Sequence, residues 1–500
     1  MDKGGLSMSR KMPIIYSALL LTGVNLLLRF VSTSFQVYLS GKIGAAGVGL
    51  LHLVLSVGSM AMTAGMAGVR TATMYLTAAE LGRKRPENVH HILSGCVSYS
   101  ILCGGCVAIF LYLLANPIAQ HWIGNLQAAP AIRLLAIFLP VSCLCGVMTG
   151  YFTAAGRIGA LAAVEVAEQL FSITTTVIAL AFWAHSDPGK ACCGVILGSG
   201  LGACLTLLTL TFLRLLEHPP QCKPFPLRKR LLDISLPLAA ADDLKVGINT
   251  LENLMVPKRL ALWSGATDPL ALFGTVCAMV FPVLMFPAAI VFSLAELLIP
   301  EMARCYAAGS HARIAYLAKK SMGIVFLYSC LLGGLLFLLA YPLCHKLYGD
   351  PNAGYYLSMY AFLVPMLYCD IIIDAMNKGL GQQKISVRYN IITALLDLLF
   401  LFLLLPKYGM IGYFTSFLIT HLLNFILSLR LLIKTAKLPL SLRSSVLTVL
   451  CLTAALFLSA FVSAPSFKCI CFILAFASLL TLCGVTGKND ILWLKGLLKN

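Results

Sequence analysis

The sequence contains few charged residues. Only 11% of its 500 residues are Asp, Glu, Lys or Arg, whereas 59% are hydrophobic and the mean hydropathy is +0.90. A soluble domain has roughly 25% charged residues, so this composition excludes an ordinary soluble protein. Hydrophobic runs of about 20 residues recur from end to end, and each is long enough to cross a ~30 Å hydrocarbon core as a helix. We therefore expect most of the chain to lie in lipid.

The hydrophobic runs predict fourteen membrane-spanning helices. Their approximate spans are 13–39, 48–78, 90–115, 129–150, 159–184, 192–216, 233–257, 270–299, 319–343, 354–377, 386–405, 410–431, 444–463 and 469–485. The second and seventh are interrupted by polar residues, and we interpret both as membrane helices with a polar face. The first is longer than the core of a signal peptide and lacks an A-x-A cleavage pattern, so we expect it to remain as an uncleaved helix.

Motifs of soluble catalytic machinery are missing. The sequence has no Walker A pattern, no HExxH and no GxSxG, and its longest predicted outward loops, 116–128 and 258–269, are short. The 18 cysteines are scattered through the spans without one CxxC pairing with another, which favours packing over metal binding. We therefore expect no enzyme activity, no ATP hydrolysis, no metal and no cofactor.

Lysine and arginine are distributed unevenly between the predicted connections. One side of the membrane would carry 26 of the 37, the other side 7, and four lie within the spans. The positive-inside rule then predicts that both termini are cytoplasmic. This asymmetry and attraction to anionic membrane lipids explain the net charge of +18, without nucleic acid as a partner.

An internal repeat divides the chain. An offset of 225 residues places Pro140 on Pro365 and Gly156 on Gly381 without a gap. We therefore expect an all-α polytopic membrane protein with two pseudo-symmetric six-helix bundles and two C-terminal helices around a central cavity, an architecture typical of transporters. The predicted boundaries are 1–216 for the first bundle, 217–232 for a basic cytoplasmic linker, 233–436 for the second bundle, and 437–500 for the added helices and a cytoplasmic tail.

Polar residues recur at helical spacing on one face of two predicted spans. On the first span they are Asn25, Arg29, Ser32 and Gln36. On the seventh span they are Asp242, Lys245, Asn249 and Glu252. A charge at the bilayer centre costs at least ~2.5 kcal/mol, so we expect both faces to line one polar cavity rather than to face lipid. Arg70, within the second span, would add a further cation near this cavity.

Four carboxylates within the spans have two interpretations, ion coupling or structural pairing. They are Glu165, Glu168, Asp370 and Asp374. Glu165 and Glu168 lie only one or two turns from the basic residue that begins their helix on the cytoplasmic side. Asp374 and Lys378 are four residues apart on the tenth span, a spacing at which the two side chains can form an ion pair.

Six segments resemble one transporter family. In order along the chain they are "NLLLRFVSTSFQVYLSGKIGAAGVGLLHL", "TAAELGRKRPENVHHIL", "GYFTAAGRIGALAAVEVAEQLF", "LMVPKRLALWSGA", "FPAAIVFSLAELLIPEMARCYAAG" and "LLLPKYGMIGYFTSFLITHLLNFILSL". Their pattern is similar to the stage V sporulation protein B and polysaccharide-exporter branch of the multidrug/oligosaccharidyl-lipid/polysaccharide flippase superfamily. One departure concerns the second helix, where that branch often has G-I-P-x-A-x-S and this chain has "AGVRTAT", which introduces Arg70.

The resemblance implies a flippase of the bacterial plasma membrane. Its cargo would be an anionic lipid-linked oligosaccharide or peptidoglycan precursor, moved from the inner to the outer leaflet by alternating access during cell-wall, polysaccharide or spore synthesis. Arg29 and Arg70 would contact the pyrophosphate, because guanidinium groups match phosphate oxygens. The polar face of the seventh span would bind sugar or peptide groups, or carry coupling protons or sodium ions.

The resemblance also bears on partners and energy source. Besides the lipid-linked sugar and membrane lipids, cell-wall synthesis enzymes would be partners, and a proton gradient, a sodium gradient or the membrane potential would drive transport. Two alternatives stay open. One is a multidrug or cation antiporter of the same superfamily, whose cavity should be acidic. The other is a cell-wall assembly scaffold that does not transport.

Overall fold

The structure is a computed structural model that describes residues 14–82, 85, 87–183, 188–216, 228–265, 268–437, 442–462 and 464–485. The regular elements of these residues are all helical. Eight of the described helices are long and apolar enough to cross a membrane, or up to ten if each of two bent helix pairs is one span. The expected all-α polytopic class is therefore confirmed, and the number of fourteen crossings stays a prediction. Residues 217–227 of the predicted linker and 486–500 of the predicted tail lie outside the described residues.

Two long helices are each bent at a glycine. Helix α1 (Ile14–Met66) leaves helical geometry at Gly44, which has a φ of 70°. Helix α15 (Gln383–Ala436) does so at Gly409, with a φ of 56°. Glycine tolerates positive φ because it has no Cβ. Each bend separates two consecutive predicted spans, the first from the second and the eleventh from the twelfth.

One compact unit consists of the described parts of Met1–Phe35 and Leu50–Leu254. Besides parts of α1, its elements are α2 (Val69–Gly82), α3 (Glu87–Leu113), α4 (Ala115–Pro117), η1 (Ile118–Ile123), η2 (Leu126–Ala128), α5 (Ala129–Ala154), α6 (Ile158–Trp183), α7 (Pro188–Leu215) and most of α8 (Arg228–Leu260). Helix α5 is central to this unit, because it packs against α2, α3 and α7, and α6 packs against α7.

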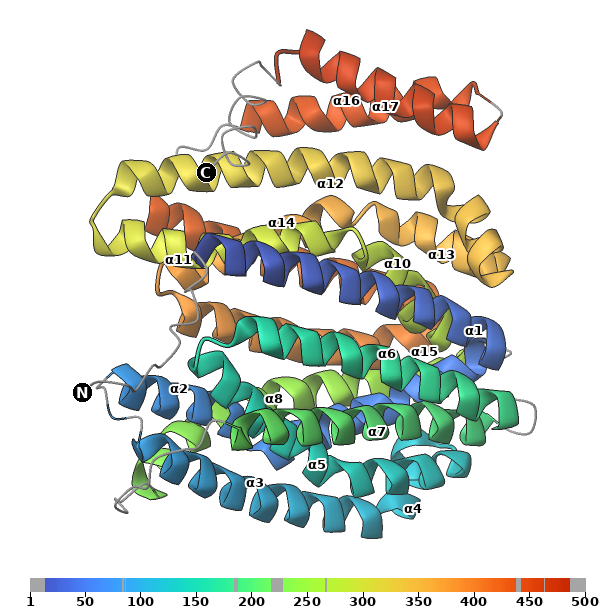
Figure 1. Cartoon of the computed structure of the whole chain (residues 1–500). Coiled ribbons are helices and arrows are strands. Elements are labelled where there is room, and N and C mark those ends of the chain that lie inside the picture. Colours follow the sequence, from blue (N-terminus) through green and yellow to red (C-terminus); the bar gives the residue numbers. More distant parts are fainter. Residues whose placement is uncertain are drawn as a thin grey trace. The chain divides into compact units, whose positions relative to one another are not determined.

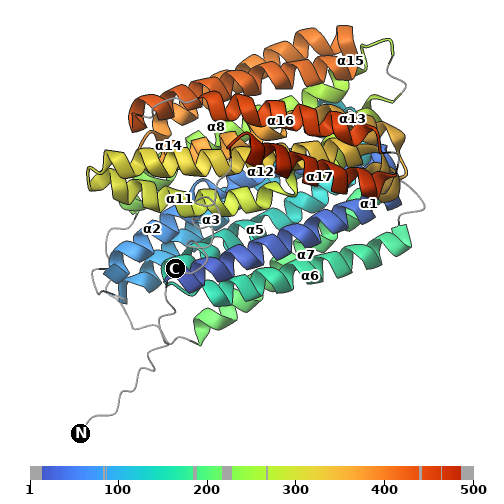
Figure 2. The ribbon, with the colours of Figure 1, turned by 90° about the horizontal axis from the view of Figure 1, so that it is seen from above.

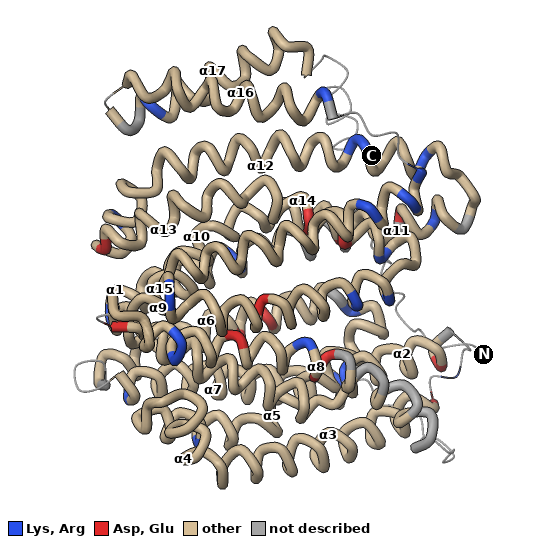
Figure 3. The backbone as a smooth tube through the Cα atoms, turned by 180° about the vertical axis from the view of Figure 1, so that it is seen from behind, with Lys and Arg blue, Asp and Glu red and all other residues tan. Residues whose placement is uncertain are grey.

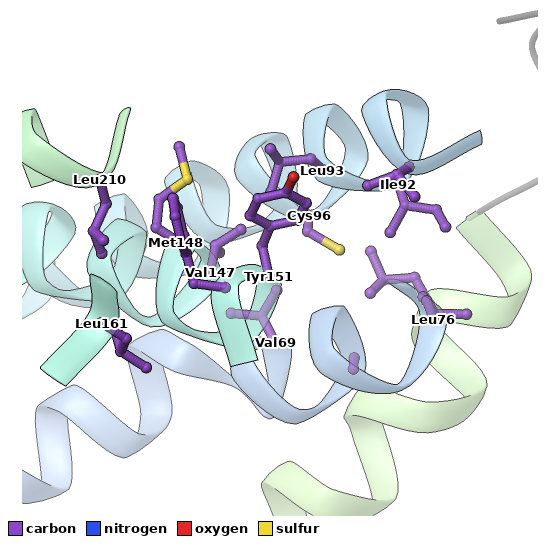
Figure 4. Packing of buried hydrophobic residues seen from close by; sticks show 14 residues of the cluster. Val69, Leu76, Ile92, Leu93, Cys96, Val147, Met148, Tyr151, Leu161 and Leu210 are labelled. Carbon is purple, nitrogen blue, oxygen red and sulfur yellow. The ribbon is translucent and has the colours of Figure 1, made fainter. Parts of the chain in front are cut away.

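A cluster of buried apolar residues fixes α2 and α3 against α5 (Figure 4). Figure 4 shows Tyr151 of α5 close to Leu93 and Cys96 of α3. The Tyr151 ring also meets the fully buried ring of Phe152 edge-on, with ring centroids 5.3 Å apart. This core lies at the end of α5 that also carries the contact with α2, so it helps to hold α2 in place.

The second compact unit consists of Gln36–Gly49 and the described part of Met255–Asn500. Its elements are α9 (Pro269–Gly274), η3 (Thr275–Val280), α10 (Phe281–Met285), α11 (Ala288–Ala307), α12 (His311–Tyr348), α13 (Pro351–Ala361), α14 (Val364–Gly379), α15, α16 (Leu442–Ala460) and α17 (Pro465–Leu482). Helix α14 packs against α11, α12 and α15. The last two helices, α16 and α17, pack against each other and on α12 (Figures 1 and 2).

The 225-residue repeat recurs in the turns of the structure. Gly156 and Gly381, which the offset places together, both have a left-handed φ, of 72° and 75°. Asn125 and Asp350, also 225 residues apart, both use a side-chain oxygen to accept a hydrogen bond at 2.9 Å from the backbone N–H two residues further along. The same turn chemistry therefore occurs at equivalent places, while the division at 217–232 into two bundles stays a prediction.

Candidate functional site

The first predicted polar face is divided between the two compact units. Arg29 is half-buried and Ser32 is exposed, and both belong to the first unit. Gln36 belongs to the second unit, where its side-chain amide donates a hydrogen bond to the carbonyl oxygen of Ala278 at 3.3 Å. Asn25 lies on the same helix, and its side chain is outside the described residues. Arg29 and Ser32 are thus the described members of this face in the first unit.

Arg70 follows a break in the backbone between α1 and α2. The chain leaves helical geometry at Ala67 and Gly68, whose φ values are 41° and 71°, and α2 begins at the next residue. Two glycines permit close packing here. A Cβ on Gly150 of α5 would lie 2.5 Å from the Arg70 carbonyl oxygen, and a Cβ on Gly68 would lie 2.5 Å from that of Ser235. The backbone of Arg70 is therefore held by α5, while its side chain is exposed.

The two carboxylates of α6 have different environments. Glu165 is half-buried and lies within electrostatic range of Arg70. Glu168 accepts a hydrogen bond from the hydroxyl of Thr206 on α7, at 2.6 Å. Gly202 of α7 faces Glu168 and leaves room for its side chain. Glu168 thus links two packed helices, whereas Glu165 balances part of the charge of Arg70.

The second predicted polar face lies on α8, and its residues belong to the first compact unit. Its exposed members are Asp242, Lys245 and Asn249, and Glu252 is half-buried. Figure 3 shows charges of both signs along α8. Next to this face, Thr250 donates to the carbonyl oxygen of Ser56 at 3.0 Å and the amide of Asn253 donates to the Ser56 hydroxyl at 3.0 Å. These bonds attach α8 to α1, so the unit that contains Arg29 and Arg70 also holds this face.

The second unit contains an acidic pocket of about 290 Å³ between α11, α14 and α15. Asp370 accepts a hydrogen bond from the amide of Asn424 at 3.1 Å. Asp374 accepts a hydrogen bond from the Ser386 hydroxyl at 2.5 Å and forms an ion pair with Lys378, with Nζ and Oδ2 2.7 Å apart. The expected pairing of Asp374 with Lys378 is therefore present, and Asp374 has both a structural partner and a position in a pocket.

Two residues of this pocket were missed by the sequence analysis. Glu296 of α11 and Asn390 of α15 also line it. Glu296 lies inside the eighth predicted span, and an acidic residue within a membrane span is itself a signal of a functional site. Asn390 carried no such signal, since an isolated amide is common in membrane helices. Within the described residues, no group of three or more His, Cys, Asp or Glu side chains could hold a metal ion.

A buried carboxylate on α15 is satisfied within the second unit. Asp397 accepts hydrogen bonds from the hydroxyls of Ser416, at 2.6 Å, and Thr420, at 3.1 Å. Both donors lie beyond the bend at Gly409, so these bonds join the two arms of α15. Asp397 therefore stabilises the hairpin, and its two neutral donors leave its charge without a cation among the printed bonds.

Comparisons with known proteins place this architecture. Residues 21–178 and 265–403, more than half of the chain, match the MatE family. Stage V sporulation protein B of Bacillus subtilis (strain 168) is 22% identical over 427 residues, which are 80% of this chain and 80% of that protein. The fold is similar to lipid II flippase MurJ in an inward closed conformation, with a TM-score of 0.68 and 11% identity over 93% of this chain and 98% of that one.

A second solved structure has a similar fold. It is a multidrug resistance MATE family transporter of the MOP superfamily in an inward-facing conformation, with a TM-score of 0.66 and 14% identity over 83% of this chain and 99% of that one. At such identities the two structures show a shared fold alone. Together with the family match, they establish a multi-pass membrane transporter rather than an enzyme fold, and the chain belongs to the MatE family of the multidrug/oligosaccharidyl-lipid/polysaccharide flippase superfamily.

Proposed function

We propose that this transporter is a flippase that moves an anionic lipid-linked oligosaccharide or peptidoglycan precursor from the inner to the outer leaflet by alternating access. The observation that carries the proposal is the position of Arg70. Its side chain is exposed although it lies within a predicted membrane span, and it follows directly on the break at Ala67 and Gly68. An exposed guanidinium at this depth needs water or an anion rather than lipid.

The break adds to the attraction for an anion. Because α2 begins at Val69, its N-terminal N–H groups and the positive end of its dipole lie beside Arg70. Transporters use the N-termini of broken membrane helices in this way to face anionic groups of their substrates. A guanidinium remains charged and can form two parallel hydrogen bonds with a phosphate. Arg70 and the end of α2 therefore suit a pyrophosphate better than they suit a cation.

Other residues of the first unit suit the rest of such a headgroup. Arg29 supplies a second cation, and α8 presents Asp242, Lys245 and Asn249 as exposed donors and acceptors. Sugar hydroxyls and peptide amides need both kinds of group. The polyprenyl tail is as apolar as lipid and needs no polar site.

The acidic pocket of the second unit suits a coupling ion. Asp370 and Glu296 both line it, and α14 supplies only one cation there, Lys378, which pairs with Asp374. We therefore assign protons or sodium ions to this pocket and the anionic cargo to the first unit. The same pocket is the observation that favours the second candidate, a multidrug or cation antiporter, since a cationic drug would also be attracted to it.

The biological setting follows from similarity. The curated relative from Bacillus subtilis carries the name stage V sporulation protein B. We place the present protein in the bacterial plasma membrane with both termini in the cytoplasm, where cell-wall or spore-coat precursors are made. Cell-wall synthesis enzymes are then its expected partners.

Reconstituted vesicles can separate the two candidate functions. A fluorescent disaccharide linked to undecaprenyl pyrophosphate is placed in both leaflets, and a membrane-impermeant reductant destroys the label outside. The proposal expects the purified protein to make the inner pool accessible, and expects no export of a cationic dye such as ethidium. Export of ethidium without movement of the lipid would reject the flippase in favour of the antiporter.

A further inference from the structure

Helix α1 contributes to both compact units. Its first part, up to Phe35, and its last part, from Leu50, belong to the first unit, while Gln36–Gly49 belongs to the second. We call Gln36–Gly49 the α1 tip. It contains the bend at Gly44, and Figure 3 shows this end of α1 beside α9.

A close backbone contact attaches the tip to α9. A Cβ on Gly49 would lie 2.5 Å from the carbonyl oxygen of Leu270. A Cβ on Gly274 would collide with the carbonyl oxygen of Ala45. Because backbone rather than a flexible side chain opposes each position, neither accepts a larger residue unless the tip moves away. The two segments are therefore held at a distance that only glycine permits.

A hydrogen bond secures the other end of the tip to a π-helical segment. In η3 the bonds skip one residue more than in an α-helix, so some carbonyl groups are turned out of the usual pattern. Gln36 donates to the carbonyl oxygen of Ala278 at 3.3 Å, and Tyr348 of α12 donates to that of Met279 at 3.0 Å. The tip thus uses a site that η3 provides, next to one used by a helix of the same unit.

Burial gives the tip a third attachment. Leu39 is 1% exposed, Ser40 4% and Val48 1%. Lifting the tip from α9 would uncover these side chains and open a gap at both glycines. Bending α1 on either side of the tip requires only small changes of backbone dihedral angles, which is how hinges normally work.

We propose that the α1 tip is a fixed part of the second unit, and that α1 is a lever through which this unit positions Arg29. When the units move in the transport cycle, α1 bends at Phe35–Gln36 and at Gly49–Leu50 while the tip stays on α9. Arg29 lies seven residues before Gln36, about 10 Å along the helix. The role given to Arg29 rests on the proposed function, whereas the docking of the tip does not. Gln36, Gly49 and Gly274 are positioning residues.

Distance measurements between spin labels can test this lever. Labels are attached through a genetically encoded unnatural amino acid, so that the native cysteines remain, at Gly41 on the tip, Tyr355 in the second unit and Leu113 in the first. Gly41 has open space around its Cα, and Tyr355 and Leu113 are 47% and 71% exposed. Pulsed dipolar spectroscopy then compares vesicles with and without an imposed membrane potential and proton gradient.

The proposal expects the distance between positions 41 and 355 to stay constant wherever the distance between 113 and 355 changes, and the distance between 41 and 113 to change with it. A shift of the distance between 41 and 355 would overturn it, because the tip would then leave its own unit. Gly274→Leu gives a readout that needs no transport. It should broaden the distribution between 41 and 355 and slow flipping about tenfold or more.

Gly323→Leu is the matched control, since nothing lies within 4 Å of a Cβ at that position of α12. It should leave both the distance distribution and the flipping rate as in the unsubstituted protein. If Gly274→Leu also leaves the distribution narrow, the tip is not held by the glycine contact and the proposal fails. A docked tip in a protein that moves no lipid-linked sugar would reject the proposed function and leave the lever intact.

Discussion

Replacement of Arg70 by alanine tests the anion site most directly. The side chain is exposed, so its removal opens no cavity and should change the free energy of unfolding by no more than about 0.5 kcal/mol. A hydrogen bond to a charged group contributes roughly 1.5 to 3 kcal/mol, which corresponds to about 10- to 150-fold in affinity. Arg70→Ala should therefore bind the pyrophosphate lipid 10- to 150-fold more weakly, by the same rough scale, while its thermal stability stays unchanged.

Two further variants give this prediction its controls. Arg70→Lys keeps the charge and loses the planar fork, so it should recover only part of the lost affinity. Arg133→Ala is the matched control, because Arg133 is also exposed and in the first unit, where its guanidinium donates to Asn116 at 3.1 Å. It should bind and transport normally.

The assay combines equilibrium binding and transport. Purified variants are titrated with the fluorescent undecaprenyl pyrophosphate disaccharide, with the same lipid lacking phosphate as a comparison, and flipping is followed in vesicles. Arg70→Ala should lose its preference for the phosphorylated lipid. Equal affinity and rate for Arg70→Ala and Arg133→Ala would refute the assignment of Arg70 to the anion site.

Three further predictions concern topology, energy source and stability. An impermeant label should reach a cysteine introduced at Asn125 from outside and one at Arg304 only after permeabilisation, and the reverse would invert the predicted orientation. Flipping should continue without ATP and stop when proton, sodium and electrical gradients are collapsed, and strict dependence on ATP would reveal a missing partner. Phe152→Ala, at a fully buried position, should lower the free energy of unfolding by about 3 to 5 kcal/mol and reduce abundance, whereas Phe182→Ala, at a residue 80% exposed, should not; equal thermal shifts would contradict the core assignment.

Hydropathy predicted the helices well because lipid imposes a simple rule on the sequence. Each predicted span overlaps a helix of the structure, since backbone groups in a bilayer must bond within their own helix. The polar interruption of the second span also marked a true break, between α1 and α2 at Ala67 and Gly68. Breaks set by packing were not visible. The spans 270–299 and 354–377 were expected to be continuous, and the structure bends each of them, by 61° and by 57°.

The candidate site was predictable only as faces of single helices. Helical spacing identified the polar faces of α1 and α8, but it could not show which helices they accompany. Gln36 shares a face with Arg29 in sequence and yet bonds to Ala278 in the other compact unit. The acidic pocket brings Glu296 together with Asp370, from helices more than seventy residues apart along the chain. Such contacts depend on tertiary packing, about which a single sequence carries no direct signal.

The internal repeat separates what the fold requires from what function requires. Asn125 and Asp350 perform the same capping at equivalent turns, because the same reversal of the backbone leaves the same N–H groups to be satisfied. The charges do not recur: the offset of 225 residues places Glu165 on Asn390, and it places no arginine on the second unit at the position of Arg70. Since helices can pack without such charges, this asymmetry is best explained by function. It agrees with an anion held in the cationic first unit and a coupling cation held in the acidic second unit.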